Sequence, residues 1–220
     1  MFISLLKKAK NLILFHLKKD ISYFRYLSMA DYKQAQILGN LRKESQVWAQ
    51  EEGIKYVANF LQGNIGSVKC GLCHGTRNGA EQAWFKKYLG MHVQVLGTEI
   101  SPTAIKYPDT IEWDFHDVKP EWVGKFDFIY SNALDHSHNP ELCLGNWVSC
   151  LNSNGVLVVE WSSSHVNVDS LDPFGASLAG IKHLIRKNHK IQKILKHKNK
   201  DRSVRYYIVI SSNSKNTSLY

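Results

Sequence analysis

The sequence has few cysteines and no long apolar run, and each shortage excludes a class of protein. Four cysteines in 220 residues are too few for a disulfide-stapled secreted domain. No stretch approaches the roughly 20 consecutive apolar residues that span a bilayer. The beginning of the chain lacks the uninterrupted apolar core and the small-residue cleavage site of a secretory signal. We therefore expect an intracellular, cytoplasmic protein whose thiols are reduced.

Acidic residues are scarce at the two ends of the chain, so the net charge of +9 is unevenly placed. Residues 1–19 carry five lysines and no acid, and residues 182–205 carry ten lysines or arginines against one aspartate. The stretch between these flanks is mildly acidic. A strongly basic protein suggests nucleic acid or an anionic membrane as its partner. Here that argument applies only to the two flanks.

The first 62 residues predict a helical extension. Residues 2–19 place apolar side chains on one face at helical spacing, with lysines elsewhere, as in an amphipathic helix. A second helical stretch is expected near 44–62, and the glycines of "QGNIGS" end it. The first helix could lie on an anionic membrane surface as a peripheral contact. The alternative, which we favour, is that it covers the sheet or the ligand pocket.

Residues 63–212 predict one α/β domain, because short apolar runs alternate with helix-like segments. The expected strands are 67–73, 92–100, 110–115, 126–131 and 155–161. The expected helical segments are 78–89, 101–106, 118–123, 139–151 and 174–188. Residues 190–198 and 203–211 read as a terminal antiparallel hairpin. This alternation predicts a doubly wound, Rossmann-like, seven-stranded, mostly parallel sheet, followed by a disordered tail at 213–220.

Three predicted strand ends carry residues suited to an adenosine-containing ligand, which in such a sheet binds at the carboxyl ends of the strands. In "HGTRNG", Gly75 and Gly79 let the backbone approach an anionic group at a helix start. In "GTEIS", Glu99 is placed to accept hydrogen bonds from two ribose hydroxyls. In "EWDFHD", Asp114 offers an acceptor for an adenine amino group and Phe115 an apolar wall.

Residues 67–161 resemble a class I S-adenosylmethionine-dependent methyltransferase, of the broad group that methylates small molecules, sugars and lipids. The resemblance runs through "VKCGLCHGTRNGAEQ", "VLGTEISPTA", "IEWDFHD", "FDFIYSNALDHSHNPE" and "LNSNGVLVVEW". With the hairpin it covers about residues 60–212. It implies S-adenosyl-L-methionine as cofactor and direct transfer of its methyl group to an acceptor. The cofactor-binding residues that it implies are Cys73, His74, Gly75, Arg77, Gly79, Glu99, Ile100, Asp114, Phe115 and Asn132.

The first motif departs from the family pattern. The usual form is acid-x-Gly-x-Gly-x-Gly, and the corresponding residues here are Gly71, Cys73, Gly75 and Arg77. Only the middle glycine is kept, and Gly79 lies two residues beyond the last position. The missing acid removes the usual contact to the amino group of the cofactor. Arg77 could instead meet the cofactor's carboxylate.

The loop after the fourth predicted strand, "SNALDHSHNP", faces the transferred methyl in the resemblance. We favour Asp135 or His136 as the catalytic base, because an imidazole titrates in the range that a general base needs. His138 stands instead at the start of the next helix. His165 is a further candidate. It lies in "SSSHVNVDSLDPFGAS", a segment long enough to act as a lid over the acceptor.

The cysteines also allow a zinc site or a redox centre. Cys70, Cys73 and His74 could start a zinc site that Cys143 and Cys150 complete. Cys70 falls inside a strand pattern, however, and the later pair is spaced along an apolar helix face. Buried cysteine often acts as a small hydrophobe. We therefore expect no metal site and no thioredoxin-like redox function.

The sequence therefore favours a methyltransferase that acts on a hydroxyl of a small molecule or a sugar. An RNA or other nucleic-acid methyltransferase is the alternative among enzymes, supported only by the basic tail. A non-catalytic adenosine-nucleotide-binding protein stays open as well, because the first glycine motif is degenerate.

Overall fold

The computed structural model describes residues 20–199 and 202–212. The helix predicted at 2–19 and the tail predicted at 213–220 lie outside these ranges, so their predictions stay untested. Among the described helices, none combines the length and the apolar character needed to cross a membrane.

Seven strands form the main sheet, in the spatial order β4-β3-β2-β5-β6-β9-β8. Their bounds are β2 (Cys70–His74), β3 (Gln94–Glu99), β4 (Thr110–Glu112), β5 (Phe126–Ser131), β6 (Leu151–Trp161), β8 (Ile191–Lys198) and β9 (Val204–Ser211). Strands β2 to β6 run parallel, and β9 lies antiparallel between β6 and β8. The predicted doubly wound sheet with a terminal hairpin is confirmed.

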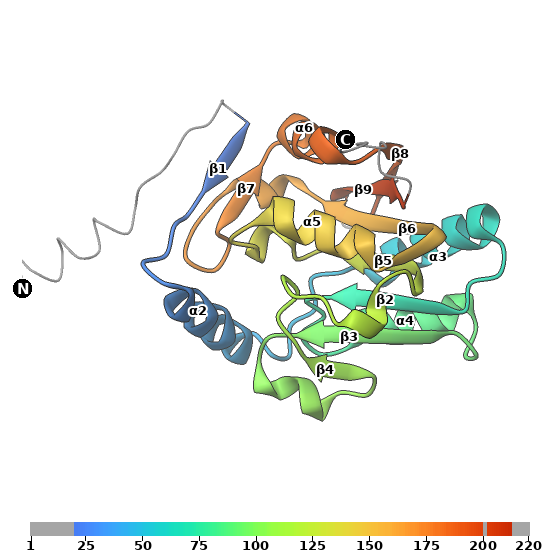
Figure 1. Cartoon of the computed structure of the whole chain (residues 1–220), viewed down its shortest axis with the longest axis horizontal. Helices are drawn as coiled ribbons and strands as arrows, with labels where there is room; N and C mark the ends of the chain where they lie inside the picture. The colour runs from blue at the N-terminus through green and yellow to red at the C-terminus, as the bar shows by residue number, and fades with distance from the viewer. Residues whose placement is uncertain (1–19, 200–201, 213–220) are drawn as a thin grey trace, which may run out of the picture.

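Helices cover both faces of this sheet (Figure 1). The helices of these two layers are α3 (Glu51–Ile65), α4 (Ala80–Leu89), α5 (Pro140–Ser149) and α6 (Leu178–Asn188), and a further helix is α2 (Met29–Arg42). Apolar side chains of α5 and α6 form one core with one face of the sheet, and those of α3 and α4 form a second core with the other face. Helix α2 belongs to neither layer and lies toward the carboxyl ends of β2 and β3 (Figure 1).

The central strands are apolar on both faces because both faces are covered. In β5, Ile129 packs into the core that contains α5 and α6, while Phe128 and Tyr130 pack into the other. Parallel strands buried in this way read as continuous apolar runs. Asn139 caps α5, since its side chain accepts a hydrogen bond from the Leu142 amide.

Several elements differ from the sequence-based expectation. The helices expected at 101–106 and 118–123 are short 3-10 turns, η1 (Pro102–Lys106) and η2 (Pro120–Trp122). The helix expected from residue 174 begins at Leu178, because residues 174–176 form a strand instead. That strand, β7 (Phe174–Ala176), pairs antiparallel with β1 (Ile21–Tyr23). Such three-residue strands are too short to show a period.

Helix α2 was not predicted from the sequence, for a physical reason. Its buried positions are Tyr32, Gln36, Gly39 and Asn40, so the face that it buries is largely polar. A search for apolar residues at helical spacing cannot recognise such a face. The helix that the pattern did predict, near 44–62, is α3 and spans Glu51–Ile65.

Candidate functional site

Two adjoining cavities lie at the carboxyl ends of β2, β3, β5 and β6. The smaller has a volume of about 50 Å³ and the larger about 340 Å³. Both are lined by Lys43, Gly75, Arg77, Ala133 and His136. The two cavities therefore form two compartments of one cleft. This is the place where a doubly wound sheet binds its ligand, since the strand order reverses between β2 and β5.

The loop after β2 forms the floor that the two compartments share. Gly75 has a φ of 71°, and a Cβ atom added there would lie 2.5 Å from the Cβ of Ala133. Only glycine therefore allows this loop to lie so close to the loop after β5. The amides of Gly75 and Thr76 both donate to the carbonyl of Thr98, which fixes the loop against β3.

Arg77 lines both compartments. Its backbone also has a positive φ, of 50°. One terminal nitrogen of the guanidinium donates to the carbonyl oxygen of Gln46 at 3.2 Å. The Nε atom is buried and has no hydrogen-bond partner among the described residues. One nitrogen of the guanidinium therefore has unused donor capacity beside the cleft.

Glu99, at the end of β3, lines the smaller compartment with its carboxylate held by the backbone. Oε1 accepts from the Ser101 amide at 2.9 Å and Oε2 from the Arg77 amide at 3.1 Å. Burial raises the pKa of Glu99, and these amides and the Arg77 charge oppose the rise. Each carboxylate oxygen keeps further acceptor capacity for a ligand hydroxyl.

Asp114, after β4, faces the smaller compartment beside Ile100 and Phe115. Its Oδ1 accepts from both the amide and Nδ1 of His116, at 3.1 Å and 2.7 Å. Burial tends to raise the pKa of Asp114, but these hydrogen bonds outweigh it and the pKa is lowered. His116 is fixed in turn by Ser137, whose Oγ lies 2.9 Å from Nε2. Asp114 is thus an ionised acceptor in a set position.

Three of the predicted cofactor-binding residues line neither compartment. Cys73 and His74 point into the core, because both faces of β2 are covered. His74 stacks on Trp147 with ring centroids 4.9 Å apart, and burial lowers its pKa to about 3. Gly79 precedes α4 with a φ of 76°, so it shapes the loop without lining the cleft. The other seven predicted residues, including Asn132, line one or both compartments.

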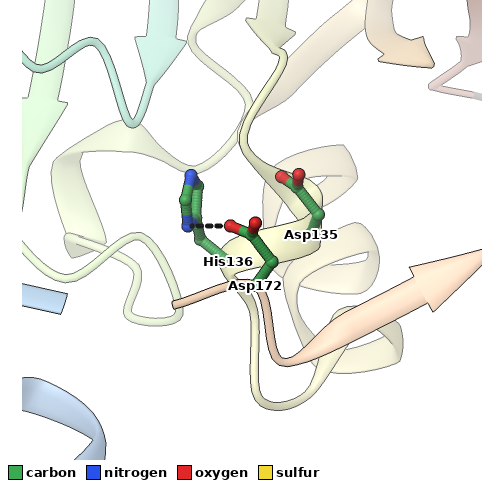
Figure 2. Close-up of side chains that lie close together, drawn as sticks. All are labelled: Asp135, His136 and Asp172. Carbon is green, nitrogen blue, oxygen red and sulfur yellow. Dashed lines mark ion pairs between the residues drawn. The ribbon is translucent and has the colours of Figure 1, made fainter. Parts of the chain in front are cut away.

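The structure brings the three predicted catalytic residues together in the larger compartment. His165 Nε2 lies 3.8 Å from Asp135 Oδ2. His136 Nδ1 lies 2.8 Å from the carbonyl oxygen of Leu171 and 3.2 Å from Asp172 Oδ1. Figure 2 shows the ion pair between His136 and Asp172, with Asp135 beside it. The segment predicted as a lid supplies His165, Leu171 and Asp172.

The partners of His136 determine which of its ring nitrogens carries a proton. A carbonyl oxygen can only accept, so Nδ1 must donate to Leu171. In the neutral imidazole, Nε2 is then the nitrogen that can accept a proton. Asp172 was not recognised from the sequence, because it stands 36 residues from His136. No local pattern joins the two.

Asp135, His136 and Asp172 also bring possible metal-ligand atoms within 4.8 Å of one another. The proton on His136 Nδ1 opposes ligation through that nitrogen, because a ligating imidazole nitrogen must be unprotonated. The four cysteines, by contrast, are free thiols. None of them belongs to a metal-type cluster within residues 20–199 and 202–212.

Two buried glutamates of the larger compartment were missed by the sequence analysis. Glu160 accepts a hydrogen bond from the Tyr130 hydroxyl at 2.5 Å and pairs with Arg205 at 3.5 Å. Glu81, in the first turn of α4, is only 4% exposed. Its Oε2 has no partner in the described part of the chain. Burial raises the pKa of Glu81 to about 8. Glu81 lies inside the first stretch that carries the resemblance. An acidic residue in that stretch was the sequence feature that could have identified it as a candidate.

The packing around position 71 leaves no room for an acidic side chain. A Cβ atom at Gly71 would lie 2.2 Å from the ring of Phe128 on the neighbouring strand. The phenyl ring fills the space that a side chain at position 71 would need. An acid there would require Phe128 to move.

No protein-family model matches the sequence, and no curated protein sequence matches it. Several solved structures, however, share the fold. One is a 1,6-didemethyltoxoflavin N1-methyltransferase from Burkholderia thailandensis with 1,6-didemethyltoxoflavin and S-adenosylhomocysteine bound. It is 12% identical, covers 92% of this chain and 98% of its own, and gives a TM-score of 0.63.

Two further structures agree. The N-methyltransferase NodS from Bradyrhizobium japonicum, in complex with S-adenosylhomocysteine, is 15% identical, covers 80% of this chain and 98% of its own, and gives a TM-score of 0.59. A TehB-like S-adenosylmethionine-dependent methyltransferase from Corynebacterium glutamicum is 17% identical, covers 84% and 99%, and gives a TM-score of 0.55. This chain has the fold of class I S-adenosylmethionine-dependent methyltransferases.

Proposed function

We propose that this protein is an S-adenosylmethionine-dependent methyltransferase that acts on a hydroxyl of a small molecule or a sugar. The observation that carries the proposal is the convergence of Gly75, Glu99 and Asp114 on one cleft. These residues end three neighbouring strands and offer a close backbone approach, an acceptor for hydroxyls and an acceptor for an amino group. Two of the structures with the same fold hold S-adenosylhomocysteine.

The residues of the cleft fit this cofactor along its length. We assign Glu99 to the ribose hydroxyls, because its carboxylate is held in place by two backbone amides. Asp114 and Phe115 are assigned to the adenine, as hydrogen-bond acceptor and apolar wall. Arg77 is assigned to the carboxylate of the methionyl end, because its buried Nε has no partner among the described residues.

When bound, the cofactor supplies an electrophilic methyl group on its sulfonium. The protein's own contribution is to orient the acceptor and to take its proton. We assign the proton to His136 Nε2, since Nδ1 is held by the Leu171 carbonyl and by Asp172. Asp135 and His165 lie in the same compartment and are assigned to acceptor binding.

The acceptor is assigned from the cleft and from the base. The larger compartment, of about 340 Å³, suits a small molecule or a sugar unit rather than a folded macromolecule. Two of the similar structures are N-methyltransferases, so a nitrogen acceptor is the nearest competitor. A hydroxyl fits better with a histidine held as base, because an alcohol must lose its proton on transfer whereas a neutral amine can attack directly.

The proposal is tested by ligand binding to the Glu99→Ala variant. We expect S-adenosylhomocysteine to raise the thermal unfolding midpoint of the unaltered protein, because a ligand that binds only the native state stabilises it. The Glu99→Ala protein should show no such shift. Glu112→Gln removes a charge at the exposed end of β4, outside both compartments, and should behave like the unaltered protein. No shift of the unaltered protein at millimolar ligand would contradict the proposal.

A methyl-transfer screen over glycans, small alcohols, amines and RNA then separates the acceptor classes. Transfer to a hydroxyl that depends on His136 supports the proposal. Transfer to an amine, or to RNA, would contradict the proposed hydroxyl acceptor and leave the proposed cofactor standing. Binding of S-adenosylhomocysteine without transfer to any acceptor class would favour the non-catalytic nucleotide-binding alternative.

A further inference from the structure

Glu81 is a buried carboxyl group that lines the larger compartment, and one of its two oxygens has no partner among the described residues. It stands in the first turn of α4, directly after the loop that both compartments share. Glu160 lines the same compartment, but Tyr130 and Arg205 already satisfy it. Glu81 Oε2 is buried and lacks a hydrogen bond from any described residue. A buried carboxyl oxygen without a hydrogen bond costs stability, so its presence at a cleft needs a functional explanation.

A cation with an unused donor lies nearby. The Arg77 charge acts on Glu81, and the two residues border the same compartment. No ion pair joins them within the described ranges, and the buried Nε of Arg77 is also without a partner there. The cleft thus offers one carboxyl group and one guanidinium group on either side of the helix start, and each has a buried polar atom without a partner among the described residues. A ligand end that carries both an ammonium and a carboxylate would satisfy both.

We infer that Glu81 binds the α-ammonium group of the methionyl end of the cofactor, while Arg77 binds its α-carboxylate. This inference rests on the proposed function. It assigns to the helix after β2 a contact that β2 itself cannot provide, because the ring of Phe128 fills the space beside Gly71. A charged hydrogen bond from the ammonium would give the unpartnered oxygen of Glu81 a donor without rearranging the core.

Protonation provides an independent readout. Burial raises the pKa of Glu81 to about 8, so at pH 7 the carboxyl group is mostly protonated before a ligand binds. An ammonium group beside it favours the ionised form and lowers that pKa. Binding should therefore release close to one proton per site at pH 7. The charged or titratable groups that act on Glu81, or on which it acts, are Arg77, Glu99, Glu160, Tyr130 and Cys73.

The experiment compares two ligands by titration calorimetry. One is S-adenosylhomocysteine, and the other is its deamino analogue, in which the 5′-thioether carries a 3-carboxypropyl chain with no amino group. In Glu81→Gln, affinity for S-adenosylhomocysteine should fall by roughly ten- to a hundredfold, the range for losing a charged hydrogen bond. Affinity for the deamino analogue should stay unchanged. Glu121→Gln, which removes an exposed charge on η2, is the matched control and should bind both ligands normally.

Each outcome separates the inference from the proposed function. If the unaltered protein does not bind S-adenosylhomocysteine, both fail. If it binds and Glu81→Gln binds equally well, or loses both ligands to the same extent, only the inference fails. Glu81→Gln should fold, because the neutral amide replaces a mostly protonated carboxyl group of equal size. Proton release in the unaltered protein, measured in buffers of different ionisation enthalpy, is a test without any variant. Equal release with both ligands would also overturn the assignment.

Discussion

Three buried glutamates around the cleft differ in how their carboxylates are satisfied, and the difference indicates their roles. Glu99 accepts two backbone amides, which place its oxygens independently of any side-chain rotamer. Glu160 is held by Tyr130 and Arg205 and forms part of the wall. Glu81 has an oxygen without a partner among the described residues. Replacing a buried carboxyl group that lacks a partner by a neutral residue usually stabilises a protein. Such a group is therefore expected where a ligand supplies the missing hydrogen bond.

His136 is the residue on which the proposed proton transfer depends. Replacing it by Gln should lower kcat by roughly 10²–10⁴-fold, the usual contribution of a general base. Asp172→Asn should cost roughly fivefold or less, because Asp172 is partly exposed and the Leu171 carbonyl still holds Nδ1. Steady-state kinetics with a hydroxyl acceptor measures both effects.

Binding of S-adenosylhomocysteine provides the control for this pair of variants. Both should keep their affinity within a small factor, since the base acts on the acceptor. A His136→Gln enzyme with nearly full kcat would assign the proton to Asp135 or His165 instead. An equal, large loss in Asp172→Asn would indicate that the ion pair, rather than the carbonyl, orients the ring.

At the scale of elements, the site depends on how closely the loop after β2 approaches the loop after β5. Gly75→Ala should destabilise the protein by about 1–3 kcal/mol, because alanine at a positive φ is strained and its Cβ would meet Ala133. It should also abolish stabilisation by S-adenosylhomocysteine, since either loop must move. Thermal unfolding with and without the ligand measures both effects.

Gly63→Ala is the matched control for this substitution. Gly63 lies in α3, and a Cβ there would have nothing within 4 Å. The protein should be stabilised by roughly 0.5–1 kcal/mol through helix propensity, with unchanged ligand binding. If Gly75→Ala bound the ligand as well as Gly63→Ala does, the close approach of the two loops would not be needed for the cleft.

The elements that form the site differ in how far the sequence could predict them. Strands β2, β3 and β5 are apolar because both their faces are buried, so their ends and the polar residues that follow were visible. Helix α2 buries Gln36 and Asn40 against the cleft, and β1 pairs with a strand some 150 residues away. Such contacts depend on the folded chain and leave no local period.

At the scale of the whole molecule, some residues of the site could be predicted from the sequence and others could not. The residues assigned to the adenosine end, Glu99, Asp114 and Phe115, lie at the carboxyl ends of predicted strands. The partners that fix the base do not, because Leu171 and Asp172 reach His136 from a connection after β6. Tyr32 likewise reaches the carbonyl oxygen of His136 from α2, 104 residues earlier. Topology predicts which strand ends meet, whereas loops and added helices complete the cleft.

The positions of the basic residues help to decide whether the acceptor is a small molecule or a polyanion such as RNA. The lysines of β8 lie on the outermost strand of the sheet, two strands away from β6, whose Glu160 lines the cleft. Lys193 and Lys196 are exposed and lie over the rings of Phe60 and Tyr206. These lysines therefore form a solvent-exposed face, and their ammonium groups lie over aromatic rings.

We therefore expect methyl transfer to a small acceptor to change little between 50 and 200 mM salt, and to be unaffected when Lys193, Lys196 and Lys198 are all changed to Gln. An RNA acceptor held by these three lysines would lose roughly twentyfold in affinity over the same range, because phosphate contacts release counterions. The triple variant would then also show a shallower salt dependence. Transfer rates and heparin retention, measured against salt for both proteins, decide the matter. A steep dependence that the triple substitution removes would assign the basic strand to a polyanionic substrate and overturn the small-acceptor proposal.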